Sequence, residues 1–110
     1  MGTDSSVIRG TLDMLILRTL QLEPMHGWGI AERIEARSDE LLKVQPGSLY
    51  AAFHRLTREG WIRSYWARTE NGRRARYYAL TKAGERQLAV ETEHWHRLAA
   101  GVARFLASES

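Results

Sequence analysis

The side chains of this sequence with the clearest potential for ligand binding are arginines and lysines, and they are concentrated in one segment. Between Arg55 and Lys82 there are eight arginine or lysine residues and only two acidic ones, a net charge of +6, whereas the remainder carries −3. Guanidinium and ammonium groups are the usual partners of phosphate. A basic segment in an otherwise mildly acidic chain indicates a phosphate-binding surface. The simpler alternative is a solvated face with loosely distributed arginines.

A second group of candidates lies on a helix expected from about residue 46 to 59, "PGSLYAAFHRLTRE". At about 100° per residue, Leu49, Ala52, Phe53 and Leu56 fall on one side of this helix. A helix in the major groove of DNA needs one face for the protein core and one for base edges. Small residues on the outer face let the backbone approach the groove. The expected DNA contacts on this helix are Gly47, Ser48, Tyr50, Ala51, His54, Arg55 and Arg58.

A β-hairpin is expected after this helix, with strands at about 62–69 and 75–80. Asn71 and Gly72 both tolerate positive φ, which predicts a tight two-residue turn between the strands. Basic residues at the turn would lie beside the DNA backbone or the minor groove and supply affinity rather than sequence choice. The expected DNA contacts on the hairpin are Arg73, Arg74, Arg76 and Tyr77.

Apolar residues at helical spacing predict three further helices, at about 9–22, 28–38 and 82–107. Thr81 is the expected N-cap of the last helix, and Gly60 is expected to end the helix at 46–59. In the connection between the second and third helices, the residues expected to turn toward the core are Leu41, Leu42 and Val44.

Three helices followed by a basic hairpin and another helix predict a winged helix-turn-helix with a long C-terminal helix. The fold class is mainly α with a small β-hairpin (α+β). We assign residues 1–81 to a DNA-binding domain and 82–110 to a dimerisation helix.

The last helix predicts self-association. Its apolar residues recur at heptad spacing, interrupted by Glu91, and a lone amphipathic helix has no other partner for such a stripe. The expected dimerisation residues are Leu88, Trp95, Leu98, Val102 and Phe105. We weigh two roles for Trp95. Interface packing is favoured, and the alternative is stacking on a flat aromatic or hydrophobic effector, with Leu12 and Leu15 nearby.

Several motifs resemble the PadR family of bacterial transcriptional regulators. They are Gly47 to Tyr50 "GSLY", the helix end at Glu59-Gly60, Tyr78 to Gly84 "YALTKAG", and "HGWGI" at 26–30. The resemblance covers about residues 9–107 and fits the short subgroup with a single C-terminal dimerisation helix. It implies a homodimer that represses promoters and releases DNA on binding an effector. The chain departs from the family pattern at Ala51, where proline is frequent, and at Trp28, where tyrosine is usual.

Other classes of protein are less well supported. No Gly-rich phosphate loop, nucleophile motif or paired carboxylates point to an enzyme, so we expect neither catalysis nor a cofactor. The chain has no cysteine, and His94 and His96 point about 200° apart on one helix, so a metal-sensing repressor is not favoured and no metal is expected. A winged-helix adaptor that binds protein instead of DNA would not need the basic segment.

The expected location is the cytoplasm. No apolar run approaches the ~20 residues of a membrane span, and the first six residues, "MGTDSS", lack the features of a secretory signal. The expected partners are therefore double-stranded DNA, a second copy of the chain and a small effector, without a membrane.

Overall fold

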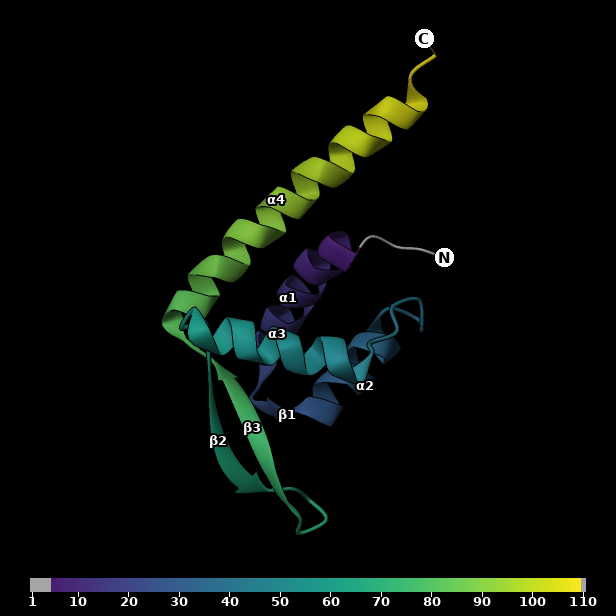
Figure 1. Ribbon diagram of the computed structural model, residues 1–110. Coiled ribbons are helices and arrows are strands. Elements are labelled where there is room, and N and C mark those ends of the chain that lie inside the picture. Colours follow the sequence, from purple (N-terminus) through teal and green to yellow (C-terminus); the bar gives the residue numbers. More distant parts are fainter. Residues whose placement is uncertain (1–4, 110) are drawn as a thin grey trace.

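The computed structural model describes residues 5–109 of the chain. The first four residues and Ser110, which belong to the two expected domains, lie outside that range. The elements are, in order, α1 (Ser5–Leu22), β1 (Met25–His26), α2 (Gly27–Arg37), α3 (Pro46–Arg58), β2 (Ile62–Arg68), β3 (Arg74–Leu80) and α4 (Lys82–Ala107). Figure 1 shows α1, α2 and α3 as one helical body from which the β2–β3 hairpin and α4 project at opposite ends. The predicted α+β winged-helix architecture is confirmed.

The core lies where α1 meets α2, α3 and the base of the hairpin. The side chains of Ile16 and Leu17 on α1 are 0% exposed. Helix α2 contributes Ile30 and Ile34 to this core. Helix α3 buries the face that the apolar periodicity predicted: Leu49, Ala52, Phe53 and Leu56.

The connection between α2 and α3 differs from the prediction. Leu41 is 83% exposed and Leu42 38% exposed, and only Val44 packs against the core. The chain takes positive φ at Asp39 and Glu40 as it leaves α2, and the connection then loops out from the helical body (Figure 1). The two leucines are therefore carried away from the core that their apolar character suggested.

The sheet has three strands rather than the two that were predicted. The strand order is β1-β3-β2, all antiparallel. Strand β1 pairs Met25 with Tyr78 and His26 with Tyr77. A two-residue strand has no periodicity of its own, so only the pairing with β3 reveals it.

The hairpin turn is also longer than predicted. Arg68 pairs with Arg74, and the Thr69 amide donates a hydrogen bond to the Arg73 carbonyl at 2.7 Å. Gly72, with φ +80°, is the turn residue in the left-handed region. The prediction of a two-residue Asn71-Gly72 turn was wrong. The three residues between Thr69 and Arg73 form a turn of the type that places glycine last.

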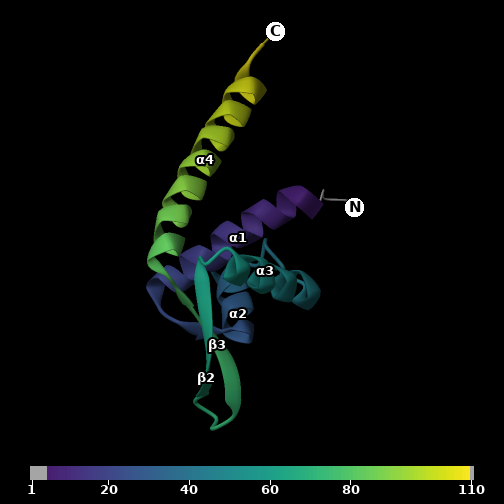
Figure 2. The ribbon, with the colours of Figure 1, turned by 60° about the vertical axis from the view of Figure 1, so that its left-hand side comes forward.

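Helix α4 begins as predicted and then leaves the body. The Thr81 hydroxyl accepts a hydrogen bond from the Gly84 amide at 3.0 Å. Figure 2 shows the rest of α4 extending beyond the other elements. None of the described helices combines the length and the continuous apolar character that a membrane-spanning segment needs.

Candidate nucleic-acid interface

The candidate interface is built first on α3, which has the two faces that the sequence predicted. Pro46 occupies the first turn, and Gly60 follows the helix with φ +79°. Four apolar side chains anchor the inner face in the core. The predicted contact residues on the exposed side are Gly47, Ser48, Tyr50, Ala51, His54 and Arg58.

Arg55 behaves differently from the other predicted contacts on α3. Its guanidinium forms an ion pair with the carboxylate of Asp13 on α1, and the two side chains are only 25% and 14% exposed. The structure therefore gives Arg55 a role in holding α3 against α1. The two residues are 42 positions apart, so no local pattern in the sequence could predict this ion pair.

One face of the hairpin carries arginines around a tryptophan. Trp66 pairs with Arg76 across the β2–β3 ladder. The guanidinium carbons of Arg74 and Arg76 each lie 5.0 Å from the centroid of a Trp66 ring, which is cation–π geometry. All three side chains are exposed. The stack fixes two cations on one side of the hairpin, and Arg73 lies beside the turn.

Tyr77 lies on the opposite face of the hairpin, away from these arginines. Its ring stacks on Tyr65 at 5.8 Å and meets His26 edge-on at 5.4 Å. Its hydroxyl donates a hydrogen bond to the Arg68 carbonyl at 3.4 Å. Successive residues of a strand point to opposite faces, so Arg76 and Tyr77 cannot both face the same ligand. Alternation in the sequence would have revealed this separation.

A stacked pair of rings joins the helix to the hairpin. Phe53 of α3 and Tyr78 of β3 stack with 4.1 Å between ring centroids. Next to them is a hollow of about 230 Å³ whose lining includes Tyr50, His54 and Arg76. Burial raises the pKa of Tyr78, and the positive charge of Arg76 opposes that effect. The exposed side of α3 and the arginine face of the hairpin therefore form one continuous surface.

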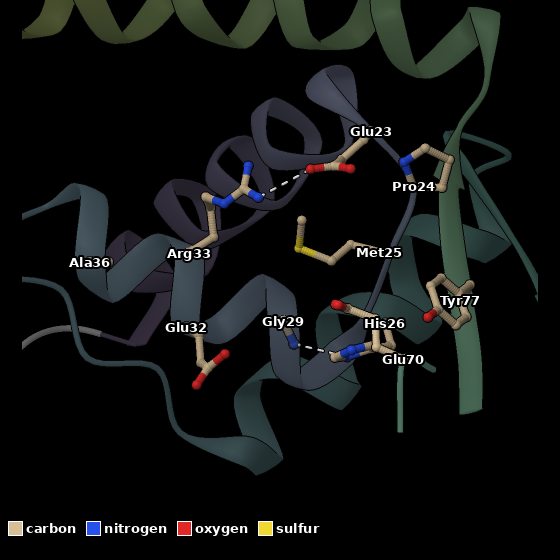
Figure 3. Close-up of a pocket in the computed structure, with 10 residues that line it drawn as sticks. All are labelled: Glu23, Pro24, Met25, His26, Gly29, Glu32, Arg33, Ala36, Glu70 and Tyr77. Carbon is tan, nitrogen blue, oxygen red and sulfur yellow. Dashed lines mark hydrogen bonds and ion pairs between the residues drawn. The ribbon is translucent and has the colours of Figure 1, made fainter. Parts of the chain in front are cut away.

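The other face of the hairpin borders an acidic pocket, shown in Figure 3. This pocket, of about 490 Å³, is lined by residues that include the carboxylates of Glu23, Glu32 and Glu70. Glu23 forms an ion pair with Arg33 at 3.1 Å, and Nδ1 of His26 accepts a hydrogen bond from the Gly29 amide at 3.0 Å. Three carboxylates thus lie on this side of the hairpin. Cations are present there too, because Arg33 lines the pocket and the guanidinium of Arg63 lies 5.5 Å from the centroid of the Tyr65 ring. Among the described residues, no cluster of three or more His, Asp or Glu side chains could hold a metal ion.

The predicted dimerisation residues fall into two groups. Leu88 is 4% exposed and belongs to the core of the chain. The others remain exposed along α4: Trp95 43%, Leu98 53%, Val102 50% and Phe105 79%.

The predicted effector residues are not equally accessible. Leu12 is 6% exposed and lies within the core, and Leu15 is partly buried against it. Of the three, only Trp95 presents a large exposed ring.

The three-helix body, the basic hairpin and the helix that carries the exposed residues define a winged helix-turn-helix protein. Comparison with known proteins gives its family. The model of the Transcriptional regulator PadR-like family matches residues 16–90. The chain belongs to this family of transcriptional regulators, as its motifs indicated.

Individual relatives agree with this assignment. An uncharacterized protein X of Lysinibacillus sphaericus is 31% identical over 91 residues, which are 83% of this chain and 84% of that protein. A transcriptional regulator from Clostridium thermocellum has a similar structure, with TM-score 0.82, 33% identity, and coverage of 91% of this chain and 97% of that one. A PadR family transcriptional regulator from Eggerthella lenta gives TM-score 0.77 and 30% identity, over 96% of this chain and 93% of that one.

Proposed function

We propose that this transcriptional regulator binds promoter DNA directly, with α3 in the major groove and the β2–β3 wing on the adjacent backbone. One observation carries the proposal: the exposed side of α3 and the Arg74–Trp66–Arg76 stack lie on the same surface, joined through Phe53 and Tyr78. The major groove of a duplex is bordered by phosphates on both sides. A helix that enters the groove, with fixed cations beside it, can therefore contact the bases and the phosphates together.

The roles of the predicted contacts differ. His54, Tyr50, Ser48, Ala51 and Gly47 face the bases in this proposal, with Arg58 closer to phosphate at the C-terminal end of α3. Arg73, Arg74 and Arg76 supply charge that does not depend on sequence. Arg55 supports the surface from within, because its guanidinium already binds Asp13. Tyr77 supports the wing from its opposite face, where its hydroxyl binds the Arg68 carbonyl.

We further propose that the protein works as a homodimer through α4. Trp95, Leu98, Val102 and Phe105 recur at heptad spacing and are each 43% exposed or more. Such a stripe favours pairing with an identical helix. A two-fold axis would then relate two copies of α3, which fits an inverted repeat with half-sites about 34 Å or a multiple of it apart. Residues up to 81 form the DNA-binding part in this proposal, and the helix from Lys82 onward forms the dimer.

Repression and release by a small effector are proposed because of the family resemblance. Trp95 is the residue to test for an effector, since Leu12 is committed to the core. We favour interface packing for Trp95, and an aromatic or hydrophobic effector stacked between subunits is the second candidate. A cytoplasmic location is part of this proposal, because the promoter DNA that the protein would bind is the partner proposed for it.

The decisive experiment is selection of bound sequences from a random duplex library at several salt concentrations. Enrichment of an inverted repeat, with an affinity that falls steeply as salt rises, is expected for a dimeric promoter-binding regulator. No enrichment combined with little salt dependence would reject DNA binding and favour a winged-helix adaptor that binds protein.

A further inference from the structure

Three large aromatic side chains remain exposed beside the candidate interface. Trp28 at the start of α2 is 70% exposed, Tyr50 on α3 is 61% exposed, and Trp66 on β2 is 53% exposed. All three line one hollow of about 660 Å³, together with Arg76. Isolated exposed aromatics are ordinary, but three that converge on one hollow indicate a binding site.

This hollow continues into the smaller one next to α3. The two share Tyr50, Arg76 and Tyr78, so together they form a trough between the helical body and the wing. No carboxylate is among the residues that line either hollow. The larger hollow is walled mainly by aromatic rings, whereas the smaller one also has the polar side chains of His54, Thr57 and Ser64. Arg76 supplies a cation to both, and the carboxylates lie in the pocket on the other face of the wing.

Short-range packing fixes the position of Trp28 at the mouth of this trough. Gly27 is buried, and a Cβ added there would lie 3.1 Å from Cε2 of Phe53. This close approach brings the first turn of α2 against α3. The pairing of His26 with Tyr77 in the β1–β3 ladder holds the same turn against the wing. Trp28 is thus placed by the fold, although nothing in the described chain covers most of its ring.

The chemistry of the trough fits a sugar–phosphate strand. A nucleic acid backbone alternates apolar deoxyribose faces with phosphate anions, which suit flat aromatic walls and a guanidinium respectively. Stacking on Trp66 limits the freedom of the Arg76 side chain, so less entropy is lost when it pairs with phosphate. The trough also lies between α3 and the wing, where the adjacent strand passes when α3 occupies the major groove and the wing rests on the backbone beside it.

We propose that one strand of the DNA backbone runs through this trough, with deoxyribose against Trp28 and Trp66 and a phosphate on Arg76. Trp28, noted from the sequence as a departure from the family pattern and not among the expected DNA contacts, then contributes affinity that is independent of base sequence. The inference depends on the proposed DNA binding and adds to it a path for the strand.

Titration of labelled duplexes with wild type, Trp28→Ala, Trp28→Phe and Arg76→Ala proteins tests the proposal. Val90→Ala is the matched control, because Val90 is also an exposed apolar residue (59%) but belongs to α4. Figure 1 shows α4 leaving the helical body at the end opposite the wing. Binding is measured by fluorescence anisotropy at several salt concentrations, on one A·T-rich and one G·C-rich duplex. Circular dichroism of each variant checks that it is folded.

The expected affinities and salt slopes distinguish the aromatic contact of Trp28 from the ionic contact of Arg76. Trp28→Ala should weaken binding to both duplexes by about tenfold without changing the salt dependence, and Trp28→Phe should restore most of the loss. Arg76→Ala should weaken binding and lower the slope of log affinity against log salt by about 0.9. Val90→Ala should bind like wild type.

Three outcomes would overturn the proposal. If Trp28→Ala binds both duplexes as tightly as Val90→Ala, the trough serves another occupant, such as a small aromatic anion. If its loss is confined to one base composition, Trp28 reads bases rather than the backbone. If wild type binds neither duplex at low salt, the proposed function itself fails, and the strand path fails with it.

Discussion

The ring of Phe53 stacks on the ring of Tyr78, at 4.1 Å between centroids and 24° between planes. Phe53 belongs to α3, and Tyr78 belongs to the central strand of the sheet, which also pairs with β1 and β2. This one contact thus fixes the orientation of the β2–β3 wing relative to α3, whose exposed side belongs to the same surface. Because both rings are almost fully buried, the angle between helix and wing is set by core packing.

The pH dependence of stability should reveal the burial of Tyr78. Burial raises the pKa of Tyr78 above its ordinary value of 10.0, so the folded chain keeps the phenolic proton to higher pH than the unfolded chain does. Stability from this group is therefore complete below about pH 10 and falls as pH rises beyond it. Chemical denaturation from about pH 8 to pH 11 should show a smaller alkaline loss in Tyr78→Phe than in wild type. Tyr50→Phe, whose ring is exposed, is the control, and parallel curves for all three proteins would contradict the prediction.

The ion pair of Arg55 with Asp13 should contribute to stability rather than to DNA affinity. Asp13→Asn leaves a largely buried guanidinium without its anion, and we expect the free energy of unfolding to fall by roughly 2 kcal/mol. Arg55→Met should cost less than Asp13→Asn, because it removes the buried charge as well. A double-mutant cycle by urea denaturation measures the coupling. Glu23→Gln, at the more exposed pair with Arg33, is the comparison and should cost less than about 1 kcal/mol.

Gly84 should not tolerate even a methyl group. A Cβ at this position would lie 2.0 Å from the Trp61 carbonyl oxygen and 2.6 Å from Cδ1 of Leu80. Gly84→Ala should therefore destabilise the chain by about 3 kcal/mol, since backbone must move to relieve the contact. Gly10→Ala on α1 is the matched control. A Cβ there meets nothing within 4 Å, and the change should stabilise by up to about 1 kcal/mol. Thermal unfolding of both variants measures the difference, and equal midpoints would contradict the assigned contact.

Removing two wing cations should weaken binding to every sequence alike. Arg73→Ala combined with Arg74→Ala should lower the slope of log affinity against log salt by about 1.8, the value for two lost phosphate contacts. Arg86→Ala with Arg97→Ala removes the same charge from exposed positions on α4 and should change the slope little. Anisotropy titrations on one mixed-sequence duplex measure both. A wing variant that binds as well as wild type would mean that the wing does not contact DNA.

Changes on α3 should instead alter sequence preference. His54→Ala and Tyr50→Ala remove exposed side chains from α3. His54 lies opposite the core, whereas the Tyr50 ring meets the buried Phe53 ring edge-on at 5.9 Å, so the stability of Tyr50→Ala is measured alongside its binding. Selection from a random duplex library should give a motif relaxed at specific positions, by about 1–3 kcal/mol per base pair. Thr57→Ala, also exposed on α3, provides a comparison toward the C-terminal end. An unchanged motif in both variants would assign base reading to other residues.

Local features of the sequence determined much of this protein. The helices, both faces of α3, the Thr81 cap and the basic segment depend on neighbours within a few residues, which periodicity and capping rules capture. The family motifs are likewise continuous stretches. Strand alternation also predicts that Arg76 and Tyr77 point to opposite faces, although both were expected to contact DNA.

Tertiary structure alone decided the features that join distant segments. The pairing of β1 with β3, the ion pair of Arg55 with Asp13, and the burial of Leu88 each depend on where another part of the chain lies. The trough between Trp28 and Trp66 is of the same kind, because it exists only when α2 and the wing stand at a fixed angle. A sequence encodes such relationships through the summed packing of the whole core, and no local pattern around either partner reports them.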